Sequence, residues 1–408
     1  MMNKHHERRR KFYSNIDNFW ADLYGQEYAL YDLKRICRQE AEKIRLITER
    51  VGKVYSKAAA LLRNVPYETF IEMGYPQETL SFLRLKTLPV ESVIARLDLI
   101  PFGDGYKCIE INSDTPTFIK ELFCINGDIC KEFGVENPNE GLEEQLYKAI
   151  QESIHQSSMG KYSHIVFTAH EDNLEDRETV KYLKHAVPLS KFTPLHKLQI
   201  KKGIGLFDEN DVKIDILYRQ TFPIENVIMD QDKEGNPIGL WLIELVEEKK
   251  LTILNPPSSF LLQNKAVQAV IWGLHEDHHP FFTEQEHRWI DDYFLPTYLE
   301  PDPFLERGVS YVKKPVFGRE GDTVEIYSEE GQLMHADNQK SYTEYTSIYQ
   351  MFIEQPKVNF QSENGFQNGY LLLGSFLLNG KPSAFGYRVG GIITDNLSYY
   401  LPVGINEQ

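Results

Sequence analysis

The chain has 408 residues, which is longer than one hydrophobic core usually supports, so we expect two or three domains. Hydrophobic residues make up 41% of the chain and aromatic residues 12%, a composition that predicts packed cores and argues against disorder. The formal net charge of -16 argues against nucleic acids and anionic membranes as partners, because both repel a strongly acidic protein.

Targeting features indicate a cytoplasmic protein. The basic residues 1–12 are not followed by an apolar segment, so we expect no secretory signal. The longest apolar run, residues 370–378, is interrupted by glycine and serine and is too short to span a bilayer. The four cysteines form no CxxC pair, which is typical of free thiols in a reducing compartment.

The first part of the chain predicts helices and then a β-hairpin. Residues 14–63 are rich in Glu, Lys, Arg, Ala and Leu and predict a helical region, which continues in shorter pieces over residues 67–83. The pattern of residues 93–112 predicts two strands joined by a tight connection. Each strand carries two polar side chains that are two positions apart and therefore share a face: Arg96 with Asp98, and Glu110 with Asn112.

The register of this hairpin decides whether the two polar pairs meet. An even register, with Ile100 opposite Tyr106, would bring all four side chains to one face, whereas an odd register would separate the pairs. Two carboxylates and a carboxamide oxygen on one face would suit Mg²⁺ beside nucleotide phosphates. The alternative is a solvent-facing ion pair between Arg96 and Glu110, worth only ~0.2–1 kcal/mol.

The middle of the chain predicts a small domain of the open α/β type. After the hairpin, Asp114 or Thr115 is expected to cap a helix that begins at Pro116. Further on, a buried strand leads into a helix, and more strands and an apolar segment follow. These segments are residues 164–169, 174–186, 204–207, 212–218 and 241–246. We therefore expect three parts: residues 1–157 with the first helices and the hairpin, an inserted domain at 158–250, and a C-terminal half at 251–408.

The C-terminal half begins with a predicted helix whose N-terminus can be identified from the sequence. Asn264 is a good N-cap, which places Lys265 at the first helical position. A lysine there is either exposed or directed at an anion. The helix ends at residues 275–280, HEDHHP, which satisfies the H-E-x-x-H pattern of zinc proteases. Because Pro280 follows the second histidine and ends the helix, a polar helix exit is the better interpretation.

The remaining candidates lie on predicted strands and their connections. Residues 311–327 predict a hairpin in which Lys314 precedes a glycine-bounded loop, GREG, from Gly318 to Gly321. Such a loop can place backbone N–H groups against phosphate oxygens, although many ordinary hairpins carry glycine and lysine. A short strand at 351–355 ends in Glu354 and Gln355. A last hairpin, turning at Asn379-Gly380, ends near Arg388, which either binds an anion or is an exposed strand arginine.

These motifs together resemble a known family. The order RLD, EIN with DTPT, QNKA, KKPVFGREG and a late GYR is similar to the synthetase domain of glutathionylspermidine synthase and its stand-alone relatives, over residues 12–405. The resemblance implies an α+β protein with the ATP-grasp fold, mixed and antiparallel sheets, and a Rossmann-like pre-ATP-grasp insertion. It also implies a ligase that uses ATP to join a carboxylate to an amine through an acyl phosphate.

The resemblance assigns a role to each candidate residue. It implies that Asp98, Glu110 and Asn112 hold Mg²⁺, and that Lys265 and Lys314 pair with ATP phosphates under a lid formed by Gly318 to Gly321. It further implies that Arg96 and Arg388 contact the transferred phosphoryl group, while the backbone of Glu354 and Gln355 meets the adenine edge.

The resemblance leaves the substrates open. The amine is spermidine, another polyamine or an unrelated amine, and Arg219 and Glu244 lie where the family builds part of its substrate site. Bifunctional members carry an amidase with a catalytic cysteine and histidine; no cysteine here has a matching context, so we expect no amidase activity. The alternative to a ligase is a nucleotide-binding protein with the same fold and no ligase activity.

Overall fold

The structure is a computed structural model that describes residues 4–157 and 163–406. Its first helix is α1 (Lys4–Tyr13), and the long helix α2 spans Arg38–Leu62. Three short strands separate the two helices: β1 (Asp22–Leu23), β2 (Gln26–Glu27) and β3 (Lys34–Ile36). The predicted helical region at 14–63 is therefore wrong for residues 14–37. Tyr24 and Gly25 both have positive φ there and turn the chain, while Trp20 and Tyr28 are buried in the core.

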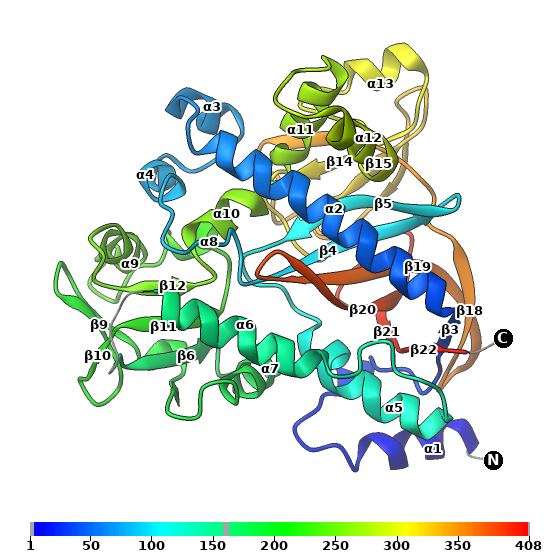
Figure 1. The fold of residues 1–408 in the computed structure, drawn as a ribbon, viewed down its shortest axis with the longest axis horizontal. Coiled ribbons are helices and arrows are strands. Elements are labelled where there is room, and N and C mark those ends of the chain that lie inside the picture. The colour runs from blue at the N-terminus through cyan, green and yellow to red at the C-terminus, as the bar shows by residue number, and fades with distance from the viewer. Residues whose placement is uncertain (1–3, 158–162, 407–408) are drawn as a thin grey trace.

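An antiparallel sheet forms the centre of the molecule, and α2 runs across it (Figure 1). Its strand order is β21 (Tyr399–Leu401), β20 (Lys381–Gly390), β19 (Gly365–Leu378), β4 (Ile94–Phe102) and β5 (Gly105–Asn112), and β18 (Lys357–Ser362) also pairs with β19. The strands β19 and β20 confirm the predicted hairpin at Asn379-Gly380. Helix α2 buries its apolar side, including Ile44 and Val51.

A β-bulge sets the register of the predicted hairpin. Arg96 lies opposite Asn112, and Asp98 lies opposite Glu110. The register then shifts by one residue, so that Leu99 pairs with Cys108 and Ile100 pairs with Lys107 rather than with Tyr106. The register is thus even only on the polar side of the bulge, and this is where it brings the four polar side chains to one face.

A second antiparallel sheet carries the predicted lysine strand. Its order is β13 (Thr297–Tyr298), β17 (Ser347–Met351), β14 (Tyr311–Pro315), β15 (Glu325–Tyr327) and β16 (Leu333–Ala336). Helices α11 (Ala266–Glu276), α12 (Glu284–Tyr293) and α13 (Asp302–Arg307) lie at the same end of the molecule (Figure 1). The strand predicted at 351–355 ends at Met351, so Glu354 and Gln355 belong to the connection to β18.

A parallel sheet lies at another end of the molecule (Figure 1). Its order is β12 (Thr252–Leu254), β11 (Ile216–Gln220), β6 (Ile165–Ala169) and β7 (Lys191–Phe192). Nearby elements are α6 (Leu142–Gln156), α7 (Leu174–Lys184), α9 (Ile238–Glu247) and the small sheet of β8 (Gln199–Lys201), β9 (Gly205–Phe207) and β10 (Lys213–Ile214). The predicted strand and helix at 164–186 are confirmed, and the apolar segment 241–246 lies within α9.

Short elements complete the fold. They are α3 (Tyr67–Glu72), α4 (Leu80–Leu83), α5 (Asn126–Phe133), α8 (Ile224–Val227), α10 (Pro257–Gln263) and β22 (Val403–Ile405), which pairs with β3. The helix expected at Pro116 begins only at Ile119, after Phe118 with a φ of 77°. Within the described ranges, we find no helix with the length and apolarity needed to cross a bilayer.

Candidate functional site

A cleft between the two antiparallel sheets brings together most of the candidate residues. It contains about 1120 Å³ of empty space, including the part that is open to solvent. Ten of the eleven residues predicted from sequence line it: Arg96, Asp98, Glu110, Asn112, Lys265, Lys314, Gly318, Gly321, Gln355 and Arg388. The exception is Glu354, which is exposed and accepts a long hydrogen bond, 3.4 Å, from the Tyr370 hydroxyl.

The hairpin supplies the acidic wall of the cleft. Arg96 donates to both carboxylate oxygens of Asp98, from Nε at 2.6 Å and from Nη2 at 3.0 Å. The alternative of a solvent-facing Arg96–Glu110 pair is therefore wrong, because Arg96 is buried and pairs along its own strand. Asn112 Nδ2 lies 3.2 Å from Asp98 Oδ2 and 3.3 Å from Glu110 Oε1, so the amide links the two carboxylates.

The charge of Glu110 is set by the cations around it. Burial opposes its ionisation, but the positive charges of Lys265, Lys314 and Arg96 outweigh burial and lower the pKa of Glu110 to about 2. Lys265 Nζ lies 3.5 Å from Glu110 Oε2. Glu110 is therefore a carboxylate at neutral pH, as a metal ligand must be.

The two lysines reach the cleft from different elements. Lys265 is the N-cap of α11 and not its first helical residue, and Asn264 Oδ1 accepts a hydrogen bond from the Ala266 N–H at 2.7 Å. Lys265 Nζ donates to the Gly318 carbonyl at 2.9 Å and so contacts the glycine loop. Lys314 is buried on β14, and burial, partly offset by Glu110, lowers the pKa of its ammonium group to about 8.

The glycine loop packs against a second loop, residues 391–396, which also lines the cleft. Gly321 has a φ of +75°, and a Cβ at that position would lie 2.7 Å from both Thr394 O and Ile393 Cγ2. A larger residue there would force one of the two loops to shift and would strain the backbone. Arg388 donates from Nη2 to the Asp395 carbonyl at 2.8 Å, which attaches the second loop to the floor of the cleft.

Arg319 is a cleft residue that the sequence interpretation missed. It lies in the glycine loop, lines the cleft, and donates from Nη2 to the Thr115 carbonyl at 3.0 Å. The sequence did contain a signal for it: Arg319 lies between the two glycines of a loop that was expected to bind phosphate, and its guanidinium group is a good partner for phosphate oxygens.

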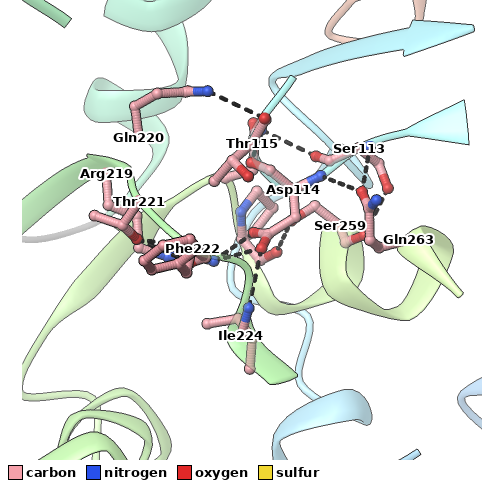
Figure 2. Close-up of polar contacts among 12 residues, drawn as sticks. Ser113, Asp114, Thr115, Arg219, Gln220, Thr221, Phe222, Ile224, Ser259 and Gln263 are labelled. Carbon is pink, nitrogen blue, oxygen red and sulfur yellow. Dashed lines mark hydrogen bonds and ion pairs between the residues drawn. The ribbon is translucent and has the colours of Figure 1, made fainter. Parts of the chain in front are cut away.

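The segment after the hairpin is attached to the parallel sheet (Figure 2). Asp114 does not cap a helix at Pro116; its carboxylate accepts hydrogen bonds from Arg219 Nη2 at 2.5 and 2.7 Å and a longer one, 3.4 Å, from the Ile224 N–H at the start of α8. The side chains of Asp114 and Arg219 are almost fully buried. Gln220 Nε2 donates to the Thr115 carbonyl at 3.0 Å. Because β11 ends at Gln220, the end of this strand holds the segment that borders the cleft. Arg219 therefore acts here as a structural anchor.

Acidic side chains gather beside Arg388. Glu121 is fully buried and accepts a hydrogen bond from the Tyr28 hydroxyl at 2.6 Å, whereas its Oε2 has no hydrogen-bond partner within residues 4–157 and 163–406. Glu175 lies in the first turn of α7. Burial, together with the negative charges of Glu121 and Asp176, raises the pKa of Glu175 to about 8. The three carboxyl groups therefore lie close together beside an arginine that lines the cleft, and Glu175 is mostly protonated at neutral pH.

Two other candidates lie outside the cleft. Glu244 is on α9 and is not among the lining residues. Helix α11 ends at Glu276, so His279 lies beyond the helix that a zinc protease motif needs, and His275 Nδ1 instead contacts His287 Nδ1 at 3.1 Å. In the part of the chain that the structure describes, no three His, Cys, Asp or Glu side chains form a group that could hold a metal ion.

Comparison with solved structures defines the class of fold. The chain is similar to a glutathione synthetase like-effector from Globodera pallida in its apo form, with a TM-score of 0.59 and 13% sequence identity, over 99% of this chain and 96% of that one. The protein is thus a mixed α/β protein with a glutathione synthetase-like fold.

The family follows from the sequence comparison. Residues 3–406 match the model "Glutathionylspermidine synthase preATP-grasp", and the chain belongs to this family. It is 22% identical over 413 aligned residues to a Haemophilus influenzae protein named "Putative acid--amine ligase", covering 95% of this chain and 91% of that protein. The family and this name support a ligase-type function.

Proposed function

We propose that the protein is an ATP-dependent carboxylate–amine ligase with the ATP-grasp arrangement. The observation that carries this proposal is the single cleft in which two carboxylates and an amide from β4 and β5 face two lysines from the second half of the chain. Phosphoryl transfer requires little covalent chemistry from a protein, so cations, metal ligands and positioning are the groups that such a site needs.

The proposed reaction has two steps. A carboxylate oxygen of the acid attacks the γ-phosphorus of ATP, the bond to the β–γ bridging oxygen breaks, and an acyl phosphate and ADP result. The amine nitrogen then attacks the acyl carbon, the C–O bond to phosphate breaks, and the nitrogen loses a proton to give the amide. We assign Lys265 and Lys314 to the ATP phosphates and Arg388 and Arg96 to the transferred group, with Arg319 as a further cation from the lid.

The acidic wall fits a magnesium ion. Asp98, Glu110 and Asn112 offer two carboxylates and an amide oxygen, and Mg²⁺ commonly uses one or two protein carboxylates together with substrate phosphates. Bound there, the ion would supply positive charge to the phosphate oxygens. The low pKa of Glu110 keeps one of these ligands ionised at neutral pH.

The other end of the cleft suits the adenine ring. Its lining there is apolar and includes Ile100, Ile109, Leu295 and Met351. The chain continues from β17 into residues 352–356, where Gln355 lines the cleft. We assign the backbone of Glu354 and Gln355 to the adenine edge and the apolar side chains to its faces.

The amine is proposed to enter on the side of Arg388. Glu175 is only partly buried and lies beside Arg388, so its carboxyl group can accept a hydrogen bond from a positively charged amine such as a polyamine. The carboxylate substrate would lie between this region and the ATP phosphates. The name of the H. influenzae relative also combines an acid with an amine.

The proposal is tested by coupling assays. The protein is incubated with ATP, Mg²⁺ and a panel of short peptides and amines, including polyamines, and phosphate release and new amides are measured by colorimetry and mass spectrometry. We expect phosphate release that requires both an acid and an amine, and its loss in Glu110→Gln. Nucleotide binding without turnover across the panel would instead support a nucleotide-binding protein without ligase activity, and failure to bind ATP would overturn the proposal.

A further inference from the structure

A chain of buried hydrogen bonds begins at Lys314 and Gln350, which both line the cleft, and leads from there into the core. Lys314 Nζ donates to Gln350 Oε1 at 2.8 Å, Gln350 Nε2 donates to Gln268 Oε1, and Gln268 Nε2 donates to the Tyr55 hydroxyl at 2.8 Å. Gln350, Gln268 and Tyr55 are at most 2% exposed. The chain joins β14, β17, α11 and α2, which are four elements from distant parts of the sequence.

The direction of each amide in this chain is determined by its neighbours. The Thr297 hydroxyl donates its single proton to the Leu295 carbonyl at 2.9 Å, so it can only accept from Gln350 Nε2, which lies 3.2 Å away. Gln268 Oε1 accepts the other proton of the same NH₂ group. Both protons of Gln350 are thereby held on the side away from the lysine, and its carbonyl oxygen faces the ammonium group.

We propose that Gln350 and Gln268 are positioning residues for nucleotide binding: Gln268 fixes the amide of Gln350, and the Gln350 carbonyl aims Lys314 Nζ into the cleft at the phosphates. This inference rests on the function proposed above. An ammonium group has three donors, and the Gln350 carbonyl and the more distant Ile109 carbonyl, at 3.5 Å, leave one for the ligand.

The physical reason is that the side-chain amide of Gln350 can turn either its carbonyl oxygen or its NH₂ group toward Lys314. If Gln268 is removed, Gln350 keeps only Thr297 as a partner for its NH₂ group, and rotation of the amide would place N–H donors against the ammonium group. Lys314 would then turn away from this unfavourable contact. Gln268 contributes to phosphate binding in this way without touching the ligand.

The test compares binding of MgATP and of adenosine by titration calorimetry. Gln268→Met should weaken MgATP binding by about tenfold, as expected for the loss of one hydrogen bond to a charged group, and leave adenosine binding unchanged. Gln268→Glu retains acceptor oxygens for Gln350 and should restore MgATP affinity. Thr48→Val is the matched control: it removes another buried hydrogen bond of α2, between the Thr48 and Ser375 hydroxyls at 2.7 Å, and should leave both affinities unchanged.

Three results would overturn the inference. One is equal MgATP affinity in Gln268→Met and the wild type, and another is an equal loss of MgATP and adenosine affinity, which indicates a merely structural role. Failure of Gln268→Glu to restore affinity is the third. If Gln268→Met does not fold, Thr297→Val removes the other acceptor of Gln350, and the same comparison of the two ligands applies. If the wild type binds no MgATP, the proposed function itself falls, and the positioning role falls with it.

Discussion

Replacing Arg219 by methionine should destabilise the protein by about 3–5 kcal/mol, the usual cost of removing one partner from a buried ion pair. Arg219 donates to both oxygens of Asp114 at 2.5 and 2.7 Å, and the two side chains are only 2% and 1% exposed. Methionine fills much of the volume of arginine but leaves the Asp114 carboxylate buried without a cation. The double variant Arg219→Met/Asp114→Asn should therefore be more stable than Arg219→Met alone, because asparagine carries no charge to desolvate.

The free energy of unfolding is measured by urea titration of tryptophan fluorescence for the wild type, Arg219→Met, Asp114→Asn and the double variant. Arg307→Met is the control, because the Arg307–Glu276 pair is 54% and 39% exposed and should contribute less than about 1 kcal/mol. If Arg219→Met remains within about 1 kcal/mol of the wild type, or if the double variant is less stable than Arg219→Met, the Asp114–Arg219 pair is not the anchor described above.

Four further predictions concern the cleft. Glu110→Gln should lower the rate of ATP-dependent phosphate release by roughly a hundredfold or more, since it removes a charge facing the reacting phosphates; a near-normal rate would disprove the assignment. The folded-state pKa of Glu110, about 2, lies below its unfolded value of roughly 4.3, so its stabilisation is complete above pH ~4.3 and is lost as the pH falls toward 2. Acid titration should therefore destabilise the wild type more than Glu110→Gln, and parallel curves would contradict this. The kcat/KM for ATP should fall as the pH rises through about 8, where Lys314 loses its proton, and Lys314→Arg should remove that fall. Gly321→Ala should raise the KM for ATP, because its Cβ would lie 2.7 Å from the Thr394 carbonyl and force the two loops apart; an unchanged KM would show that their packing is not needed.

Short-range patterns together with the family resemblance were enough to find most of the candidate site. The spacing of Arg96 and Asp98, and of Glu110 and Asn112, placed each pair on one face, and the structure brings both pairs into the cleft. The register between the pairs was not predictable, because it depends on the bulge beside Leu99 and no residue type there specifies a bulge. Their assigned roles in metal and phosphate binding remain predictions.

Long-range contacts explain where the sequence interpretation was wrong. Asp114 fits the pattern of a helix cap, but its carboxylate contacts Arg219, 105 positions later, and so cannot start a helix at Pro116. The helix-forming composition of residues 38–63 was likewise extended over residues 14–37, where Trp20 and Tyr28 pack into the core from short strands and turns. Local propensity contains no information about either partner surface.

The pairing of β4 with β19 has a consequence for how the protein is made. Leu99 pairs with Leu373, about 270 positions later, so the apolar strand β4 leaves the ribosome long before its neighbour. At about 5–20 residues per second, the interval is roughly 14 to 55 seconds. During that time the edge of β4 that will pair with β19 is unpaired and can pair with other chains. Nascent chains are therefore expected to depend on chaperones until β19 is synthesised, and truncation before residue 365 should give insoluble protein that does not bind nucleotide.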